Sequence, residues 1–430
     1  MTRWKKLTTT VALTAALTGA FVGLNPVQKV PEAAATTYEG FGAAATGGAG
    51  HPIYRVTRCD DDKDNPVQGM LRHASLQGNR TIVFDVACGP GSPNPLAIFG
   101  TNWIYFKSNT TVDGTTAPSP GFQYLGTLAV GGQKCSPRCN NVIILGMSYR
   151  PDGRTITNFA LKVERGAHTI VFDHNTFEGC GNDCIGISSV EGSNPTTYVD
   201  SYNITISRNL FNHPFRIDPG AEGTEYGAST AALFTQRSRR ISFIYNLIYD
   251  SGRRNPRVSY DPSVKPTDTV IDVRNNVMYD VVGGTGSQDG GVILYDNVRA
   301  NVVNNYLKAT SGLPDDSKKK VILICKPSGT APEDGSFCGT RIDVEKVYVS
   351  GNISADGWSA HINTKGTTGN QQVAAAVTTL DACAAAKSVS QDVGAPYKNT
   401  HDLAALNDVT LTECSFTPVQ PPISLRLIGM

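Results

Sequence analysis

The densest cluster of side chains that could do chemistry lies at residues 252–258, whose sequence is GRRNPRV. Arg253, Arg254 and Arg257 each carry a planar guanidinium that can hold a carboxylate through two parallel hydrogen bonds. A basic loop that faces only solvent is the alternative for such a charge run. The whole chain has 38 basic and 37 acidic residues, a formal net charge of +1, so an anionic ligand must be attracted locally. This balance gives no indication of a nucleic acid or an anionic membrane as partner.

Paired carboxylates, which a glycoside hydrolase needs as acid and base, do not occur in the strand-rich part of the sequence. Asp60, Asp61 and Asp62 precede that part, and Asp315 and Asp316 fall in a loop-like stretch late in it. Hydrolysis of a glycosidic bond is therefore not expected.

Ten cysteines indicate disulfides in an exported protein, because disulfides persist on the oxidising side of a membrane. The two C-x3-C units could instead form a zinc site, but no histidine stands at ligand spacing beside them. We expect bridges that pin loops. Local spacing predicts the pairs Cys59–Cys88, Cys135–Cys139, Cys180–Cys184, Cys325–Cys338 and Cys383–Cys414.

The N-terminal residues also indicate export. Three basic residues among the first six precede an apolar and threonine-rich run at 7–24, and three alanines follow at 33–35. This order is typical of a secretory signal peptide, with an anchored N-terminal helix as the alternative. No later stretch approaches the ~18 consecutive apolar residues of a membrane span. We predict a signal peptide over 1–35 and a secreted, extracellular mature chain with no membrane partner.

Short runs rich in Val, Ile, Phe and Tyr recur from about Thr81 onward, each ended by Gly, Asn or Asp. Runs of this length and composition are typical of strands bounded by turns. No helical period separates most of them, which argues against alternating strands and helices. The runs are TIVFDV (81–86), NVIILG (141–146), HTIVFDHNTF (168–177), NITISRNLF (203–211), RISFIYNLI (240–248), DVRNNVM (272–278), ANVVNNYL (300–307) and VYVSGNI (347–353).

An asparagine recurs in six of these runs, at positions that differ by 34, 37, 30, 29 and 47 residues. Self-similarity at such a period predicts a solenoid, in which each coil buries its apolar face on the next. Asparagine tolerates the left-handed backbone of a sharp corner, and its amide can bridge to the coils above and below. We therefore expect one stacked, structural corner, with loops of unequal length elsewhere that could build a binding face. The asparagines are Asn175, Asn209, Asn246, Asn276, Asn305 and Asn352.

The amino-acid composition changes after Lys365. Residues 371–387 are alanine-rich and predicted to be helical, and the tail after Cys414 is rich in proline. We predict a solenoid domain over 36–364 and a C-terminal segment over 365–430 that caps the last coil or runs back along the outside. A capped solenoid is expected to be a monomer.

Nine segments, in the same order along the chain, resemble polysaccharide lyase family 1, the pectate lyases. The resemblance spans roughly Tyr38 to Val409. It implies an all-β, right-handed, single-stranded parallel β-helix that cleaves polygalacturonate (pectate) by β-elimination. The segments are YEGFGAAATGGAG (38–50), TIVFDV (81–86), TTVDGTTAP (110–118), NVIILGMSYRP (141–151), GAHTIVFDHNTF (166–177), ISFIYNLIYDSGRRNPRV (241–258), DVRNNVMYDV (272–281), NVVNNYL (301–307) and DACAAAKSVSQDVGAP (381–396).

That reaction removes a weakly acidic proton from the carbon next to a uronate carboxylate, so the site must stabilise the negative charge that develops there. The family does so with calcium and arginine. The resemblance assigns Arg254 as the proton acceptor, Arg257 and Arg216 as groups that bind substrate carboxylates, and Asp183 as a Ca²⁺ ligand. An arginine, with an ordinary pKa above ~12, suits a base only in alkaline conditions, where family members are often most active.

Two positions at which the family places calcium-binding acids hold other residues here. Asn158 or Phe159 stands at the first, and Ile187 stands four positions after Asp183. A hard cation needs several carboxylate or carbonyl oxygens, so we expect weak calcium binding. Other acids that could supply oxygens are Glu178, Asp218, Glu222 and Glu225.

Three hypotheses follow. The first is a pectate lyase that recruits calcium through Asp183 and the carboxylates of its acidic polysaccharide substrate. The second is a calcium-independent pectin lyase, which acts on methyl-esterified chains and relies on arginine. The third is a β-helix that binds polysaccharide without cutting it. The overall sequence favours the first.

Overall fold

The fold is described from a computed structural model. It describes residues 37–89, 96–98, 102–132, 135, 138–150, 159–180, 183–188, 199–212, 230–236, 238–252, 254–260, 270–281, 291–295, 298–309, 322–324, 346–355 and 370–414.

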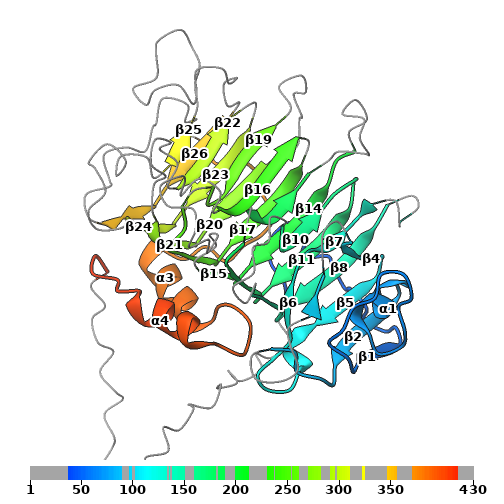
Figure 1. Cartoon of the computed structure of the whole chain (residues 1–430). Coiled ribbons are helices and arrows are strands. Elements are labelled where there is room, and N and C mark those ends of the chain that lie inside the picture. The colour runs from blue at the N-terminus through cyan, green and yellow to red at the C-terminus, as the bar shows by residue number, and fades with distance from the viewer. Residues whose placement is uncertain are drawn as a thin grey trace, which may run out of the picture.

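Three parallel sheets wind around one axis as a β-helix, and a complete coil contributes one strand to each sheet (Figure 1). The ten-stranded sheet has the spatial order β1 (Ile53–Val56), β2 (Arg80–Phe84), β5 (Thr110–Asp113), β8 (Asn140–Leu145), β11 (His168–Asp173), β14 (Tyr202–Ser207), β17 (Arg239–Ile244), β20 (Val270–Arg274), β23 (Arg299–Val303) and β26 (Lys346–Ser350). The nine-stranded sheet has the order β3 (Leu96–Ala97), β6 (Gln123–Leu125), β9 (Ser148–Tyr149), β12 (Thr176–Glu178), β15 (Leu210–Asn212), β18 (Leu247–Tyr249), β21 (Val277–Val281), β24 (Tyr306–Ala309) and β27 (Ile353–Ser354). The eight-stranded sheet has the order β4 (Ile104–Phe106), β7 (Leu128–Val130), β10 (Leu161–Val163), β13 (Asp183–Ile187), β16 (Thr230–Gln236), β19 (Arg257–Tyr260), β22 (Val292–Tyr295) and β25 (Ile322–Ile324).

The core is a column of apolar side chains stacked along the axis. Phe172, Ile206 and Phe243 occupy the same register position on β11, β14 and β17, and all are fully buried. Burying a side chain of this size is worth about 1.5–3 kcal/mol, but only when a neighbouring coil covers it. The expected parallel β-helix is thus confirmed, and all eight apolar runs form strands of the ten- and nine-stranded sheets.

The predicted asparagine corner is an unbroken ladder. Asn209 Oδ1 accepts from the backbone N–H of Asn175 at 2.9 Å and from its Nδ2 at 3.0 Å, and Asn246 receives the same pair of bonds from Asn209. The ladder continues through Asn276 and Asn305 to Asn352. Each buried amide is therefore satisfied by the next coil.

One detail of that prediction is wrong, because the ladder asparagines are not the left-handed residues. Positive φ angles belong to the residue before each rung, for example 50° at His174, 51° at Arg208 and 55° at Tyr245. The corner is turned one residue early, so the asparagine is left free to point its amide along the stack.

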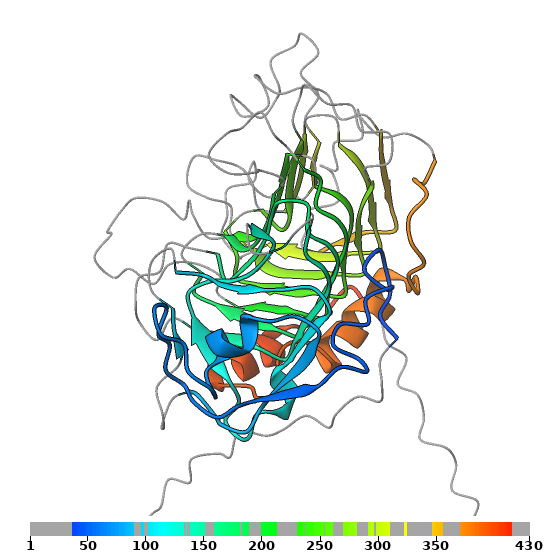
Figure 2. The ribbon, with the colours of Figure 1, turned by 90° about the vertical axis from the view of Figure 1, so that its right-hand side faces the viewer.

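The N-terminal glycine-rich segment lies on the outer face of the ten-stranded sheet, where its backbone bonds to sheet side chains. Gly42 N–H donates to Thr205 Oγ1 at 2.9 Å, and Gly48 N–H donates to Thr111 Oγ1 at 2.9 Å. A Cβ at Gly42 would lie 2.3 Å from the carbonyl oxygen of Ile170, so only glycine permits this approach. The C-terminal chain joins it, since Gly40 N–H donates to the Ala376 carbonyl (Figure 2).

The prediction of a helix over 371–387 is wrong for its first part. Residues 370–380 have no regular secondary structure, and helix α3 spans Ala382–Gln391, with Asp381 capping it through the N–H of Ala384. The part before α3 is held by side chains of the corner, since Asn275 Nδ2 donates to the carbonyl of Thr378 at 2.9 Å. Such bonds use backbone carbonyls that a helix would need for its own hydrogen bonds, and they outweigh the helix propensity of the alanines.

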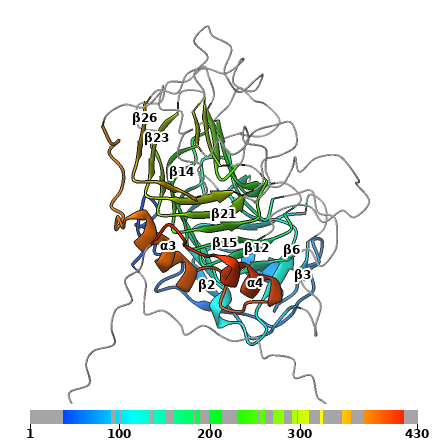
Figure 3. The same cartoon turned by 90° about the vertical axis from the view of Figure 1, so that its left-hand side faces the viewer.

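The described part of the C-terminal segment, residues 370–414, continues as a strap along the side of the solenoid. Helices α3 and α4 (Thr400–Asp408) lie over the nine-stranded sheet, where α3 contacts β21 and β24 and α4 contacts β15 (Figure 3). Buried Arg150 anchors α4 through ion pairs with Asp402 and with Glu178 of β12. The strap therefore covers a side of the solenoid.

Four of the predicted disulfides are present, and the fifth pair, Cys325 and Cys338, lies outside the described residues. Both C-x3-C units are bridged, Cys135 to Cys139 and Cys180 to Cys184, which settles the alternative of a zinc site. Within the described ranges, no helix is long and apolar enough to cross a membrane.

Candidate functional site

The eight-stranded sheet carries the candidate site. The glycine-rich segment and residues 370–380 lie on the ten-stranded sheet, and α3 and α4 lie on the nine-stranded sheet. Among the described elements, the main contacts of α3 and α4 are with β15, β21 and β24 of the nine-stranded sheet and not with β10, β13, β16 or β19.

The register of the strands places two cations on that face. Lys162 of β10 pairs with Gly186 of β13, Gly186 with Leu233 of β16, and Leu233 with Arg257 of β19. The flanking residues Leu161, Val163 and Val258 are fully buried in the core, so Lys162 and Arg257 project outward. Three strand spacings separate the two positions, about 14 Å.

Asp183 and Arg254 meet at the edge of the same sheet. Arg254 Nη1 donates to both carboxylate oxygens of Asp183, at 3.1 and 3.0 Å, and Thr230 Oγ1 donates to Oδ1 of the same carboxylate. The Asp183 side chain is 1% exposed and that of Arg254 is 18% exposed. The predicted metal ligand and the predicted base are therefore direct partners.

The backbone at Arg254 is left-handed, with φ at 63°. An arginine rarely adopts this conformation, and such residues gather at functional sites when the surrounding structure holds them. Here the Arg254 carbonyl accepts from the N–H of Ala232, and the N–H of Asn255 donates to Gly291, so both neighbouring coils fix the turn. The guanidinium is thus aimed by backbone contacts as well as by Asp183.

Lys162 is a site residue that the sequence analysis missed. Its Nζ lies 4.0 Å from the centroid of the Phe159 ring. A Cβ at Gly186 would come within 3.1 Å of that Nζ and 2.5 Å of the ring, so the glycine makes room for both side chains. Burial lowers the pKa of Lys162, while the carboxylates of Glu164 and Asp183 oppose that shift.

The described residues do not fit a calcium site of the expected kind. Nη1 of Arg254 holds both oxygens of Asp183, Phe159 fills one expected acid position with an aromatic ring, and Ile187 at the other is buried in the core. Among the described residues, no group of three or more His, Cys, Asp or Glu side chains could hold a metal. A hard cation also gains little beside two protein cations.

The remaining predicted residues divide as follows. Arg257 lies on the outer face of β19, and Arg216 lies outside the described residues. Glu178 belongs to another sheet, where it pairs with Arg150 and accepts from His401 at 2.6 Å, so it is not an oxygen donor for this site. Asn158 is not described, nor are the other candidate oxygen donors Asp218, Glu222 and Glu225.

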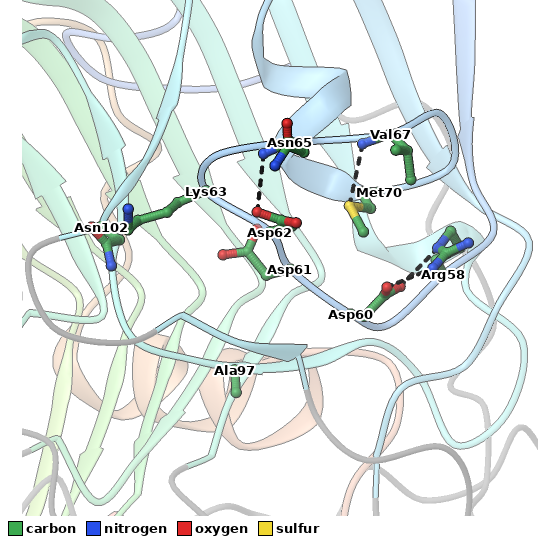
Figure 4. Close-up of a pocket in the computed structure, with 10 residues that line it drawn as sticks. All are labelled: Arg58, Asp60, Asp61, Asp62, Lys63, Asn65, Val67, Met70, Ala97 and Asn102. Carbon is green, nitrogen blue, oxygen red and sulfur yellow. Dashed lines mark hydrogen bonds and ion pairs between the residues drawn. The ribbon is translucent and has the colours of Figure 1, made fainter.

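A pocket near the N-terminal end of the solenoid is lined by Asp60, Asp61 and Asp62 (Figure 4). Each carboxylate is engaged by the protein. Asp60 pairs with Arg58, Asp61 pairs with Arg72, and Asp62 accepts from the N–H of Asn65 at 3.0 Å. These bonds give the acidic triplet a structural role.

No protein-family model matches the chain. A probable pectate lyase C from Aspergillus flavus is 26% identical over 268 residues, which cover 62% of this chain and 52% of the relative. Pectate lyase 1 from Cryptomeria japonica is 25% identical over 347 residues, covering 73% of this chain and 79% of the relative. The chain thus spans about half the length of the fungal relatives it matches.

A solved structure confirms the architecture. The crystal structure of Jun a 1, the major allergen from cedar pollen, has a TM-score of 0.57 and 17% sequence identity over 83% of this chain and 92% of that chain. At this identity the likeness concerns the fold alone. The chain is thus similar in sequence to proteins named pectate lyases, and its right-handed parallel β-helix is the fold of that solved structure.

Proposed function

We propose that this protein is a polysaccharide lyase that cleaves polygalacturonate, an acidic plant polysaccharide, by β-elimination, with Arg254 as the base. The observation that carries the proposal is the Arg254–Asp183 pair on the sheet that the strap and the N-terminal segment leave open. The names of its relatives support the substrate class. The side chain of Arg254 is 18% exposed, which is enough for a polysaccharide chain on this face to reach the guanidinium.

The proposed step moves one proton and breaks one bond. Arg254 takes the proton from the carbon next to the uronate carboxylate. The electron pair of that C–H bond forms a carbon–carbon double bond, and the glycosidic oxygen leaves the neighbouring carbon with its own electron pair and takes a proton from solvent. Negative charge develops on the carboxylate, and cations fixed in the site stabilise it without reorganising. Arg257 stands on the same outer face and could bind that carboxylate as a fork.

Asp183 is a positioning residue in this proposal. Its carboxylate is buried and holds one nitrogen of the guanidinium, so it fixes the direction of the other end of Arg254. A guanidinium hydrogen-bonded to a carboxylate must give up its charge to act as a base. We therefore expect the reaction to be fastest in alkaline solution.

The misfit of the described residues with calcium favours a calcium-independent version of this reaction over the first hypothesis of the sequence analysis. Asp183 is the one predicted ligand among the described residues, and Arg254 occupies it. A non-catalytic binding protein is the other alternative, and the same experiment separates it.

The experiment is the ultraviolet absorbance of the unsaturated product, measured with polygalacturonate and with methyl-esterified pectin, each with calcium and with a chelator. We expect a rise on polygalacturonate that Arg254→Ala abolishes. Arg254→Lys, which keeps a cation but not the fork, serves as the matched variant. Binding of both polysaccharides without any rise in absorbance would make the protein a binding module.

Export is part of the proposal. Four disulfides among the described residues suit the oxidising exterior, and polygalacturonate is an extracellular polymer. Expression of the full chain in a bacterial host, followed by N-terminal sequencing of the protein in the medium, tests this. A mature N-terminus near Thr36 is expected, whereas an uncleaved chain retained with the cells would contradict it.

A further inference from the structure

Lys162 lies on the same outer face as Arg257 and close enough to Asp183 to interact with it electrostatically. Its side chain leaves β10 on the outer face, because Leu161 and Val163 on either side are buried in the core. The ammonium lies toward β13, over the bare backbone of Gly186. It therefore reaches the strand that begins with Asp183, the partner of Arg254.

The ammonium is held by a ring and not by a counter-ion. Nζ sits 4.0 Å from the centre of Phe159, an attraction that fixes a cation without neutralising it. Among the described residues, no carboxylate lies within ion-pair distance of this Nζ. Asp183 and Glu164 act on it only at longer range.

The local charge is consequently positive. Asp183 and Glu164 supply two negative charges, but Asp183 is hydrogen-bonded to Arg254 and Glu164 pairs with Arg165 at 3.4 Å, so Lys162 adds a positive charge beyond these two pairs. Such an arrangement attracts an anion and repels a divalent cation. The positive charge of Lys162 is therefore one reason why these residues do not fit a calcium ion.

We propose that Lys162 is a built-in cation of the site, which binds a free carboxylate of the polysaccharide directly and removes the need for a bridging calcium ion. This inference rests on the proposed function for its substrate class. It also gives a specificity, because an ammonium distinguishes a free carboxylate from a methyl ester. The site would thus take unesterified uronate chains without calcium, unlike either enzymatic hypothesis of the sequence analysis.

The test is calorimetric titration of tri-galacturonate in the presence of a chelator. Lys162→Met is expected to weaken binding at least about tenfold, the cost of losing one charge-assisted hydrogen bond. Lys162→Arg keeps the charge and is expected to retain most of the affinity. Lys387→Met, at an exposed position of α3, removes the same charge far from the sheet and is the matched control. Circular dichroism of each variant checks that it is folded.

A methyl-esterified trimer supplies a second arm, since wild type and Lys162→Met are expected to bind it equally. Wild-type binding that needs calcium, or equal affinity of wild type and Lys162→Met for the free acid, would overturn the inference. Failure of the lyase proposal is distinguishable: Lys162-dependent binding without an unsaturated product sinks the lyase and leaves this inference standing. Cleavage that needs calcium would support the lyase proposal and overturn the role proposed for Lys162.

Discussion

Arg254 and Asp183 lie 71 residues apart in the sequence and are joined in the structure by hydrogen bonds from one guanidinium nitrogen to both carboxylate oxygens, at 3.1 and 3.0 Å. They reach each other because β13 and the turn before β19 are two coils apart in one sheet, with Thr230 of β16 between them. The coil-by-coil register of a β-helix thus converts distant sequence positions into one site. The pair places a prospective base against a buried carboxylate.

Asp183→Asn should lower kcat by about two orders of magnitude with a small change in KM, because the amide keeps the shape but loosens the aim of Arg254. Steady-state kinetics on polygalacturonate provides the measurement. Thr230→Val removes the other donor to Asp183 and leaves the ion pair, so a milder effect is expected. Equal losses in the two variants would mean that Asp183 has no special part in positioning Arg254.

Asn246→Ala should destabilise the solenoid by about 2–4 kcal/mol, because it removes the side-chain hydrogen bonds of Asn246 with Asn209, with Asn276 Oδ1 and with the carbonyl of Ile206. Urea unfolding followed by circular dichroism measures this. Asn352→Ala, at the partly exposed last described rung, is the matched control and should cost less. If the ladder does not stabilise the fold, Asn246→Ala and Asn352→Ala will lower the free energy of unfolding by the same amount.

Stability should fall in alkaline solution through His174. Burial alone would lower the pKa of His174, but hydrogen bonds to Asp173 and Asp392 outweigh it and raise the pKa from 6.5 to about 9. The protonated ring therefore stabilises the fold fully below about pH 6.5, and this stability is lost as the pH rises through about 9. The loss is about 3 kcal/mol at most.

His174→Gln should flatten that part of the pH dependence, as measured by the free energy of unfolding at several pH values. Because Asp392 follows α3 at its C-cap, the wild-type protein should also loosen its strap before it loses the β-helix. An identical pH slope in wild type and variant would contradict the assignment.

Removing the Cys383–Cys414 bridge should free the strap without affecting the site. The bridge closes a segment of 31 residues that contains α3 and α4, and its loss is worth about 3.5 kcal/mol to that segment. A Cys383→Ser, Cys414→Ser double variant should be cut faster by trypsin within the strap, while its activity changes less than about twofold. A large loss of activity would show that the strap supports the eight-stranded sheet.

The sequence predicted two of the three sheets. All its apolar runs lie in the ten- and nine-stranded sheets, where long strands are joined at the asparagine corner. The strands of the eight-stranded sheet were not predicted. In β10, β13 and β19 the outward residues Lys162, Gly186 and Arg257 interrupt the apolar pattern, whereas β22 and β25 are apolar runs of only four and three residues. Alternation in Leu161–Lys162–Val163 was the available signal, but three residues are too few to predict a strand.

The candidate site was predicted in part for the same reason. Arg254, Arg257 and Asp183 could be named from the resemblance, but their contacts depend on how many residues each loop inserts between coils, which periodicity does not give. Likewise, the absence of the expected acids was visible, while the cation that stands near Asp183 was not. Only the register of β10 against β13 brings Lys162 there.

The central claim is tested most directly by the absorbance of the unsaturated product on polygalacturonate in the presence of a chelator. A rise in wild type that Arg254→Ala abolishes and Lys162→Met reduces at least about tenfold is the predicted result. No rise until calcium is added, with Lys162→Met as active as wild type, would contradict the account and restore a calcium ion to the site.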